Sequence, residues 1–297
     1  MAGIFTVASR EFSDMVRSKR FLVLIVIFTS VMIIPMVQIY VQVIRSGATP
    51  YPDIPGTSMP RRFLGTMGYM LAGTFAAFAP IISVGLGCDA ISGEREKGTL
   101  KIIMAQPIYR DTVINGKFVA ATSAVSLAIL ITSLGIVGVS TILLGVTPTV
   151  EETLRIGLYF AFSILFTMTF YGLAAFISTI IKKTSLSVIL SIGMWAVFAF
   201  VIPMLASMIA MAIAYGGDWN NYMATFETIY SLSPSYHFSK IGEHLLGTYS
   251  YGPPSEFQET SVTSSLMYAG PNILVLAIVT TLFFIASYIT FTRQEIR

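Results

Sequence analysis

Long apolar stretches alternate with short charged segments along the whole 297-residue chain. A transmembrane helix needs about 20 apolar residues, because each residue rises about 1.5 Å and the hydrocarbon core is about 30 Å thick. Six stretches reach that length, and none of them contains an Asp, Glu, Lys, Arg or His residue. They are Phe21–Val43, Phe63–Gly87, Phe118–Val146, Ile156–Ile181, Leu186–Ala214 and Pro271–Thr292. The pattern predicts an all-α, polytopic membrane protein with six transmembrane helices.

The composition supports membrane embedding and excludes several other classes of protein. Hydrophobic residues make up 55% of the chain, charged residues make up 11%, and the mean hydropathy is +0.77. Soluble domains carry about 25% charged residues, so a water-soluble fold would expose too much apolar surface. Disorder is excluded on the same ground. A net charge of +3 is too small to indicate nucleic-acid binding, and the single cysteine, Cys88, cannot form an internal disulfide. We expect one transmembrane domain over residues 1–297.

The distribution of basic residues predicts the orientation of the chain in a cell membrane. Six spans place both termini on the same side. That side holds 13 of the 18 Lys and Arg residues, in segments 1–20, 88–117, 182–183 and 293–297. The other side holds five. Because cytoplasmic loops are enriched in Lys and Arg, both termini are expected in the cytoplasm.

Residues 1–20 are expected to form an amphipathic helix at the membrane interface. At 100° per residue, one face collects Ile4, Phe5, Ala8, Phe12, Met15 and Val16. Val7 interrupts the polar face. The apolar face suits the acyl boundary, and the basic residues, Arg17, Lys19 and Arg20 among them, suit the headgroups. The helix is either a simple topogenic anchor or an elbow helix that positions the first span in an assembly. The apolar run that follows is too long for a cleaved signal peptide.

The segment between the second and third spans combines charges, glycine and apolar residues in a short space. The mixed charges of residues 94–97 are expected to extend the second span into the cytoplasm as a solvated helix. Gly98 allows a sharp reversal, and Thr99 is expected to cap a short helix over residues 100–105 that Pro107 terminates. The apolar residues of that helix are Leu100, Ile102, Ile103 and Met104. The apolar side chains of such a helix must be shielded from water, and the bilayer surface, neighbouring spans or a cytosolic partner could shield them.

This segment resembles the first cytoplasmic loop of the type-2, export-type permeases of ATP-binding-cassette (ABC) transporters. That loop reads Gly-Glu-Arg-x-x-Gly-Thr-Leu-Glu, then a short apolar run and a proline. The matching residues here are Gly93, Glu94, Arg95, Glu96, Lys97, Gly98, Thr99, Leu100 and Lys101, followed by Ile102–Gln106 and Pro107. Lys101 departs from the usual acidic residue, which puts in doubt any salt bridge made from that position. The six-span layout and the segments 9–12, 17–20 and 232–238 are also similar to this family.

The resemblance implies a transport function without a catalytic site in this chain, so the chain itself is not expected to be an enzyme. Permeases of this family pair as homodimers or heterodimers and bind two separate ATPase subunits, which would hold the ATP and Mg²⁺. This chain would then be the transmembrane subunit of an ATP-driven ABC exporter, and the helix after Gly98 would be its coupling helix, seated in a groove of the ATPase. The coupling residues implied are Gly93, Glu94, Arg95, Glu96, Lys97, Gly98, Thr99, Leu100, Ile103 and Pro107. Alternatively, residues 94–107 merely connect two spans.

The residue content bears on the energy source independently of the family. Proton-driven transporters usually need a titratable group at membrane depth, and the six spans offer none. No GxxxxGK[ST] phosphate-binding loop occurs in the chain. Active transport would therefore draw its energy from another polypeptide, and the uncharged spans favour an amphipathic or lipid-like cargo. A passive channel and a membrane scaffold that anchors other proteins are the alternatives.

The outer segment 215–270 is expected to contain short helices at the membrane interface. Aromatic residues recur at helical spacing over residues 219–230, and apolar contacts favour a second helix over Tyr236–Leu246. His237 and His244 could share one helical face, but two imidazoles without a third ligand do not predict a metal site.

Two spans carry packing signals. Gly68, Ala72 and Ala76 form a ladder of small residues in the second span, which permits close approach of another helix. Pro203 is expected to kink the fifth span. The resemblance implies that spans one, two and five line a dimer interface, and ordinary packing within one chain is the alternative.

Overall fold

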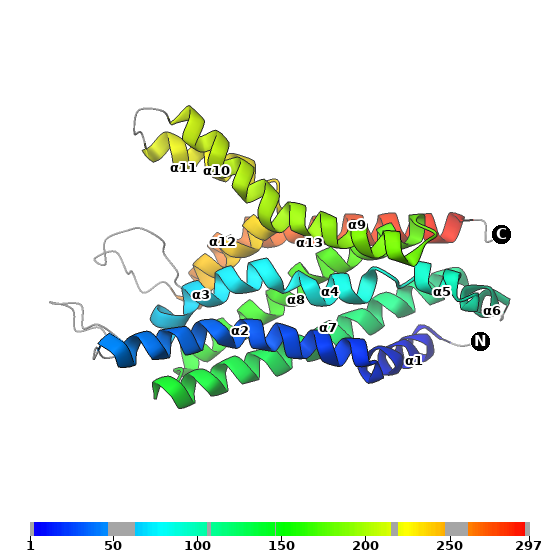
Figure 1. Ribbon diagram of the computed structural model, residues 1–297, viewed down its shortest axis with the longest axis horizontal. Coiled ribbons are helices and arrows are strands. Elements are labelled where there is room, and N and C mark those ends of the chain that lie inside the picture. Colours follow the sequence, from blue (N-terminus) through cyan, green and yellow to red (C-terminus); the bar gives the residue numbers. More distant parts are fainter. Residues whose placement is uncertain are drawn as a thin grey trace.

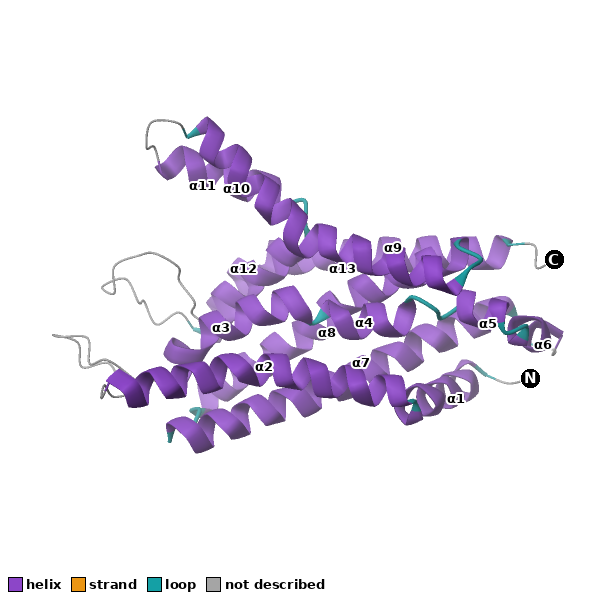
Figure 2. Ribbon diagram, in the orientation of Figure 1, coloured by secondary structure: helices purple, strands orange, loops and turns teal. Residues whose placement is uncertain are grey.

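The computed structural model describes residues 3–46, 63–105, 108–145, 147–214, 219–246 and 261–294. The described residues form helices and no strands, which confirms the predicted all-α class (Figure 2). In chain order the elements are α1 (Ile4–Arg17), α2 (Lys19–Ser46), α3 (Phe63–Phe78), α4 (Pro80–Gly87), α5 (Ser92–Glu96), α6 (Thr99–Ala105), α7 (Arg110–Leu144), α8 (Val150–Ile180), α9 (Thr184–Ala196), the π-turn η1 (Val197–Val201), α10 (Ile202–Ile213), α11 (Trp219–Tyr230), α12 (Pro234–Leu246) and α13 (Val262–Arg293).

Six helical units in the described part of the chain are long and apolar enough to cross a membrane, as predicted. They are α2, α3 with α4, α7, α8, α9 with α10, and α13. Figure 1 shows the long helices running roughly side by side, with α8 in the middle of the bundle. The N-terminus, α1, α5, α6 and the end of α13 all lie at one end of the bundle (Figure 1). The segment that carries the family-like motif therefore meets both termini.

The second span is divided into α3 and α4 at Ala79, whose backbone stays helical and whose N–H donates to the Phe75 carbonyl at 2.9 Å. α3 ends at Phe78 and α4 begins at Pro80, because a proline lacks the N–H that would continue the ladder of backbone hydrogen bonds. The indole of Trp195, from the fifth span, donates a hydrogen bond to the carbonyl of Ala77 at 3.1 Å. A side chain of another span thus satisfies a backbone acceptor next to this division.

The fifth span also changes direction, and Pro203 explains where. The proline cannot donate to the carbonyl four residues before it, and the chain widens into the π-turn η1 immediately upstream. The hydroxyl of Ser233 donates to the carbonyl of Phe198 inside that turn at 2.9 Å. Beyond η1, α10 and α11 form a hairpin that diverges from the other helices (Figure 1).

The two helices expected in the outer segment are present, but α12 packs into the bundle instead of lying only at an interface. Its buried face carries Phe238, Ile241, Leu245 and Leu246. The ring of Phe238 stacks on Phe166 of α8 with centroids 4.3 Å apart. His237 pairs with the Asn272 side chain at 2.9 Å and with the Ser231 carbonyl at 3.0 Å. These partners explain the histidine as a structural residue of the α12–α13 contact.

The small-residue ladder of the second span serves packing within the chain. Ala72 and Ala76 of α3 are both buried. A Cβ built on Gly242 of α12 would lie only 3.0 Å from the Cβ of Ala72. The two helices therefore approach closely at this point because both residues are small.

Candidate functional site

The candidate site is the segment 88–117 at the end of the bundle that holds both chain termini (Figure 1). It leaves α4 through a turn at residues 88–91 and forms the two short helices α5 and α6 before α7 begins at Arg110. Every described helix that ends or begins at this end of the bundle contributes a polar contact to it, as the following contacts show.

The turn after α5 depends on Gly98. Its φ of 75° lies in the left-handed region, which glycine adopts without the steric cost that a side chain brings. The predicted reversal at Gly98 is therefore confirmed. The predicted cap is wrong: Thr99 is the first residue of α6, and its hydroxyl donates back across the turn to the Glu94 carbonyl at 3.2 Å. The Lys101 N–H instead donates to the Gly98 carbonyl at 3.3 Å, which starts α6.

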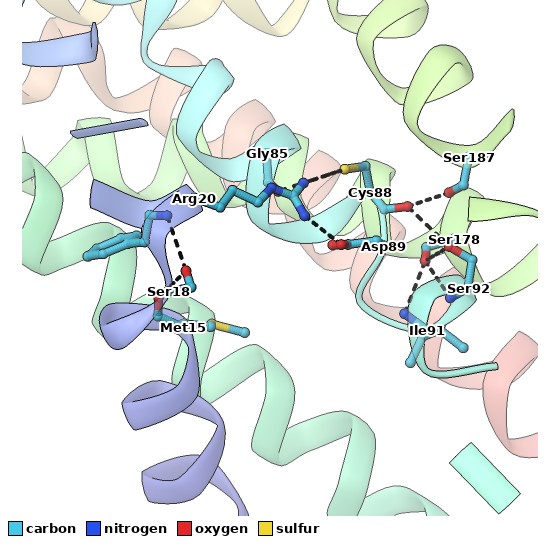
Figure 3. A network of polar contacts seen from close by, with 11 residues as sticks. Met15, Ser18, Arg20, Gly85, Cys88, Asp89, Ile91, Ser92, Ser178 and Ser187 are labelled. Atoms are coloured by element: carbon cyan, nitrogen blue, oxygen red, sulfur yellow. Dashed lines mark hydrogen bonds and ion pairs between the residues drawn. The ribbon is translucent and has the colours of Figure 1, made fainter. Parts of the chain in front are cut away.

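The turn before α5 is held by two serines from other spans (Figure 3). The N–H groups of Ile91 and Ser92 donate to the Ser178 hydroxyl at 3.0 and 2.9 Å, at the end of α8. The Ser187 hydroxyl of α9 donates to the Cys88 carbonyl. Buried N–H and C=O groups need partners, and here they find them on α8 and α9. The path of this turn is therefore set by the fourth and fifth spans.

Arg20 holds the same turn from the opposite side. Its guanidinium donates to the Asp89 carboxylate and to the Cys88 sulfur, the latter at 2.9 Å (Figure 3). The interfacial helix expected over residues 1–20 is correspondingly shorter. α1 ends at Arg17, and the hydroxyl of Ser18 accepts the N–H of Phe21 at 3.1 Å and caps a new helix. Lys19 and Arg20 thus belong to α2, and Arg20 binds the loop while its side chain stays 42% exposed.

Two of the four charges at residues 94–97, those of Glu94 and Arg95, are partly buried and not solvated as expected from sequence, whereas Glu96 and Lys97 are exposed. The Glu94 carboxylate contacts the ammonium of Lys117 at 2.5 Å, and Lys117 is only 3% exposed. The same ammonium contacts Glu11 of α1 at 3.0 Å. We call Glu11, Glu94 and Lys117 the carboxylate–lysine cluster. It joins α1, α5 and α7 at one point.

Arg95 attaches α5 to the ends of two further spans. Its guanidinium donates to the Thr179 and Ile181 carbonyls at 3.2 and 3.4 Å and to the side chain of Gln294. Arg110, at the start of α7, donates to the Gln294 carbonyl at 2.6 Å. The end of α13 is therefore held between the two arginines that flank α6.

The remaining charged residues of the motif extend the same attachment or face solvent. The Glu96 carboxylate accepts the Thr184 N–H at 3.0 Å, at the start of α9. Gly93 is buried next to Asp89. Lys97 and Lys101 are exposed.

The short helix α6 has one anchored residue and one free apolar residue. Leu100 is 1% exposed and belongs to the apolar core, whereas Ile102 is 65% exposed. Pro107 and the side chains of Ile103 and Met104 lie outside the described residues, so this contrast concerns Leu100 and Ile102 alone. α6 is thus fixed at its base and presents an apolar side chain outward.

α1 packs closely on α7, and this contact explains the residue that interrupts its amphipathic pattern. A Cβ built on Gly116 would lie 2.7 Å from Cγ1 of Val7, so Val7 faces the groove that the glycine leaves. Phe12 packs partly buried against the core, whereas Ile4 and Phe5 are exposed. The two most N-terminal apolar residues are therefore free to contact a membrane interface or another protein.

Sequence reasoning found the motif but missed the residues that hold it. Lys117, Ser178, Ser187 and Gln294 come from four different spans, the third to the sixth, and their spacing along the chain carries no sign of the contact. One feature of the sequence could have identified Lys117 as a buried residue with a partner. Lys117 directly precedes an apolar stretch that contains no charge, so it lies at the depth where a lysine needs a partner.

Comparisons with known proteins agree with the motif and the fold. A family model described as "ABC-2 family transporter protein" matches residues 5–296. A protein named "Probable ABC transporter permease protein NosY" from Pseudomonas aeruginosa is 25% identical over 220 residues, covering 73% of this chain and 74% of that one. A protein of the same name from Stutzerimonas stutzeri is 26% identical over 226 residues, covering 74% of each chain.

Proposed function

The chain belongs to the ABC-2 family of transporter proteins and is a membrane subunit of an ABC transporter, and from this premise we propose that a separate ATPase subunit drives it through α6. The observation that carries the proposal is the arrangement around Gly98. The left-handed turn projects α6 from the end of the bundle, with Leu100 anchored in the core and Ile102 exposed. A rigid base with a free apolar side chain suits a helix that receives force from a partner.

The contacts of the 88–117 segment support the same role. Its turn and α5 are bonded to α2, α8, α9 and the end of α13, and Lys117 at its end is bonded to α1, so a push on α6 reaches every one of these helices. Packed helices shift as bodies instead of deforming continuously. Closure of the ATPase dimer on ATP would therefore tilt the spans together and alternate access to the two sides of the membrane.

The wider assembly follows from the same premise. ATP and Mg²⁺ bind the ATPase, and this chain holds neither. Both termini and α6 face the cytoplasm, in line with the excess of Lys and Arg at that end. The chain pairs with a second permease chain, and the apolar side chains that α9 and α10 expose contact that chain or lipid.

The cargo that fits the spans best is amphipathic or lipid-like, and the direction of transport is export. The described charged side chains sit near the ends of the bundle, as Lys117 and Arg155 illustrate. Between those ends the fourth span offers buried hydroxyls such as Ser163 and Thr167, which bond to backbone carbonyls of their own helix. A strongly charged cargo would lack partners on such a path.

The test is recovery of an ATPase with the chain purified gently from its native host. Ile102→Asp places a charge on the exposed side of α6 and is expected to reduce the recovered ATPase about tenfold, equivalent to about 1.4 kcal/mol. Tyr109→Asp is the matched control, because Tyr109 is 66% exposed in the same segment but lies outside α6. It is expected to leave recovery unchanged.

Three results would contradict the proposal. Equal recovery in both variants would show that α6 does not bind the ATPase. A chain that is recovered alone and gives full flux in liposomes would be a passive channel. Partners that bind without any movement of cargo on ATP addition would indicate a scaffold.

A further inference from the structure

We propose that Lys117 is a positioning residue that transmits nucleotide-driven movement of α6 to the N-terminal helix α1. The inference rests on the proposed function and extends it to a helix that the motif does not include. Lys117 lies on α7, directly between the last turn before α6 and the middle of α1. Its single ammonium holds Glu94 on one side and Glu11 on the other, at 2.5 and 3.0 Å.

The charges of the carboxylate–lysine cluster make both contacts depend on one group. Two carboxylates share one ammonium, and the second oxygen of Glu94 is buried without a hydrogen-bond partner. Two partly buried carboxylates repel each other at short range unless a cation lies between them. A displacement of Glu94 therefore changes the field at Lys117 and Glu11 together. A buried group is screened little by salt, so the effect is not lost to solvent.

The packing around Lys117 makes it a stiff connection. The Lys117 carbonyl accepts the hydroxyl of Tyr171 at 3.4 Å, which ties the α7 backbone to α8. One residue earlier, the bare Gly116 lets Val7 and the α1 backbone sit directly on α7. α1 therefore cannot slide along α7 without moving Glu11 relative to the ammonium.

α1 has a second ion pair, which does not connect it to another helix. Arg10 and Asp14 are 4.0 Å apart on the exposed face of α1 itself. Within the part of the chain that the structure describes, the ion pair that links α1 to another helix is the one made by Glu11. Movement of α5 and α6 therefore has a specific polar route to α1, and this route ends at Glu11.

The experiment measures nucleotide-induced distance changes in the complete transporter, purified with its ATPase and reconstituted in nanodiscs. One spin label replaces Phe5 on α1 or Lys101 on α6, and the second replaces Ile142 at the far end of α7. All three positions are exposed, whereas the native Cys88 is buried and stays unlabelled. Distances are recorded without nucleotide and with Mg-ATP and vanadate.

Glu11→Gln is the decisive variant. It leaves a one-to-one pair of Lys117 with Glu94, so the buried charge becomes more balanced and the protein is expected to fold. We expect the α6 label to move as in the unmodified protein and the α1 label to lose most of its shift. Asp14→Asn makes the same chemical change in an exposed pair of the same helix and is expected to change neither distance. Glu11→Asp keeps the charge and is expected to restore part of the α1 shift.

The failures of this inference and of the proposed function can be told apart. If α6 moves and α1 does not move in the unmodified protein, or if Glu11→Gln and Asp14→Asn give the same α1 shift, the relay through Lys117 is refuted while the role of α6 stands. If nucleotide leaves α6 itself unmoved, the proposed function is refuted and this inference with it.

Discussion

Replacement of Gly116 by alanine tests whether the seat of α1 on α7 is as tight as the structure shows. The added Cβ would lie 2.7 Å from Cγ1 and 2.9 Å from Cβ of Val7, and 3.4 Å from the Ala8 nitrogen. Contacts under 3.0 Å cannot persist, and a β-branched valine has no free rotamer to move into on a helix. α1 must therefore shift as a body away from α7.

The size of the effect follows from two opposing terms. Overpacking of a close helix contact costs about 1–3 kcal/mol. Alanine in place of glycine inside a helix returns up to about 1 kcal/mol. The difference gives a net loss of stability for Gly116→Ala of up to about 2 kcal/mol, and the shift of α1 also lengthens the contact of Glu11 with Lys117.

The control lies on the same helix. A Cβ built on Gly138 of α7 meets nothing within 4 Å, so Gly138→Ala keeps the gain in helix propensity without the clash. Thermal unfolding in detergent should therefore rank Gly138→Ala at or above the unmodified protein and Gly116→Ala below it. Hydrogen exchange of the α1 amides should rise in Gly116→Ala alone. Val7→Ala should rescue Gly116→Ala only in part, because its Cβ remains 2.9 Å away.

The opposite ranking would refute the packing that we describe. If Gly116→Ala is as stable as Gly138→Ala and the α1 amides stay protected, then α1 does not sit on α7 at this distance. The geometric basis for a stiff link between α1 and Lys117 would then be lost.

Two further substitutions test other contacts. Gly98→Ala should cost about 1–2 kcal/mol in the left-handed turn and weaken ATPase recovery, while Gly98→Asn should cost less, because asparagine tolerates this conformation. Equal recovery with both variants and the unmodified chain would contradict a requirement for the left-handed turn at residue 98. Arg155→Met removes the guanidinium that donates to the buried Leu245 carbonyl and Ser265 hydroxyl, so the free energy of unfolding should fall by about 1–3 kcal/mol in thermal unfolding. An unchanged unfolding temperature would show that this buried arginine does not hold α12.

The fold class could be predicted from the sequence because it depends on a property that each segment carries alone. A stretch of about 20 apolar residues partitions into a bilayer whatever its neighbours are. The amphipathic N-terminal helix and the reversal at Gly98 could be predicted for the same reason. The helix follows from the period of its apolar residues, and the reversal follows from a residue that accepts positive φ. The family motif added a transport role to this outline.

The interruptions of the second and fifth spans were harder to predict from the sequence. Pro80 and Pro203 are visible in the sequence as positions where a helix can be disturbed. A proline alone does not show whether the helix bends there or is interrupted. In the structure each interruption lies beside a hydrogen bond from another part of the chain to a helix carbonyl. Trp195 supplies a donor beside the first interruption and Ser233 beside the π-turn, and each comes from a distant part of the chain.

By itself, the sequence determined six spans, their charge-free interiors, a basic end and a turn at Gly98, because each follows from local hydropathy, charge or backbone sterics. Only the tertiary structure decided that Glu94 and Arg95 are partly buried, bond to other helices and are not solvated charges. An ionised group stays in water unless contacts with partners offset the free-energy cost of its desolvation. Those partners, Lys117 and the carbonyls at the end of α8, are brought to the motif by the packing of other helices.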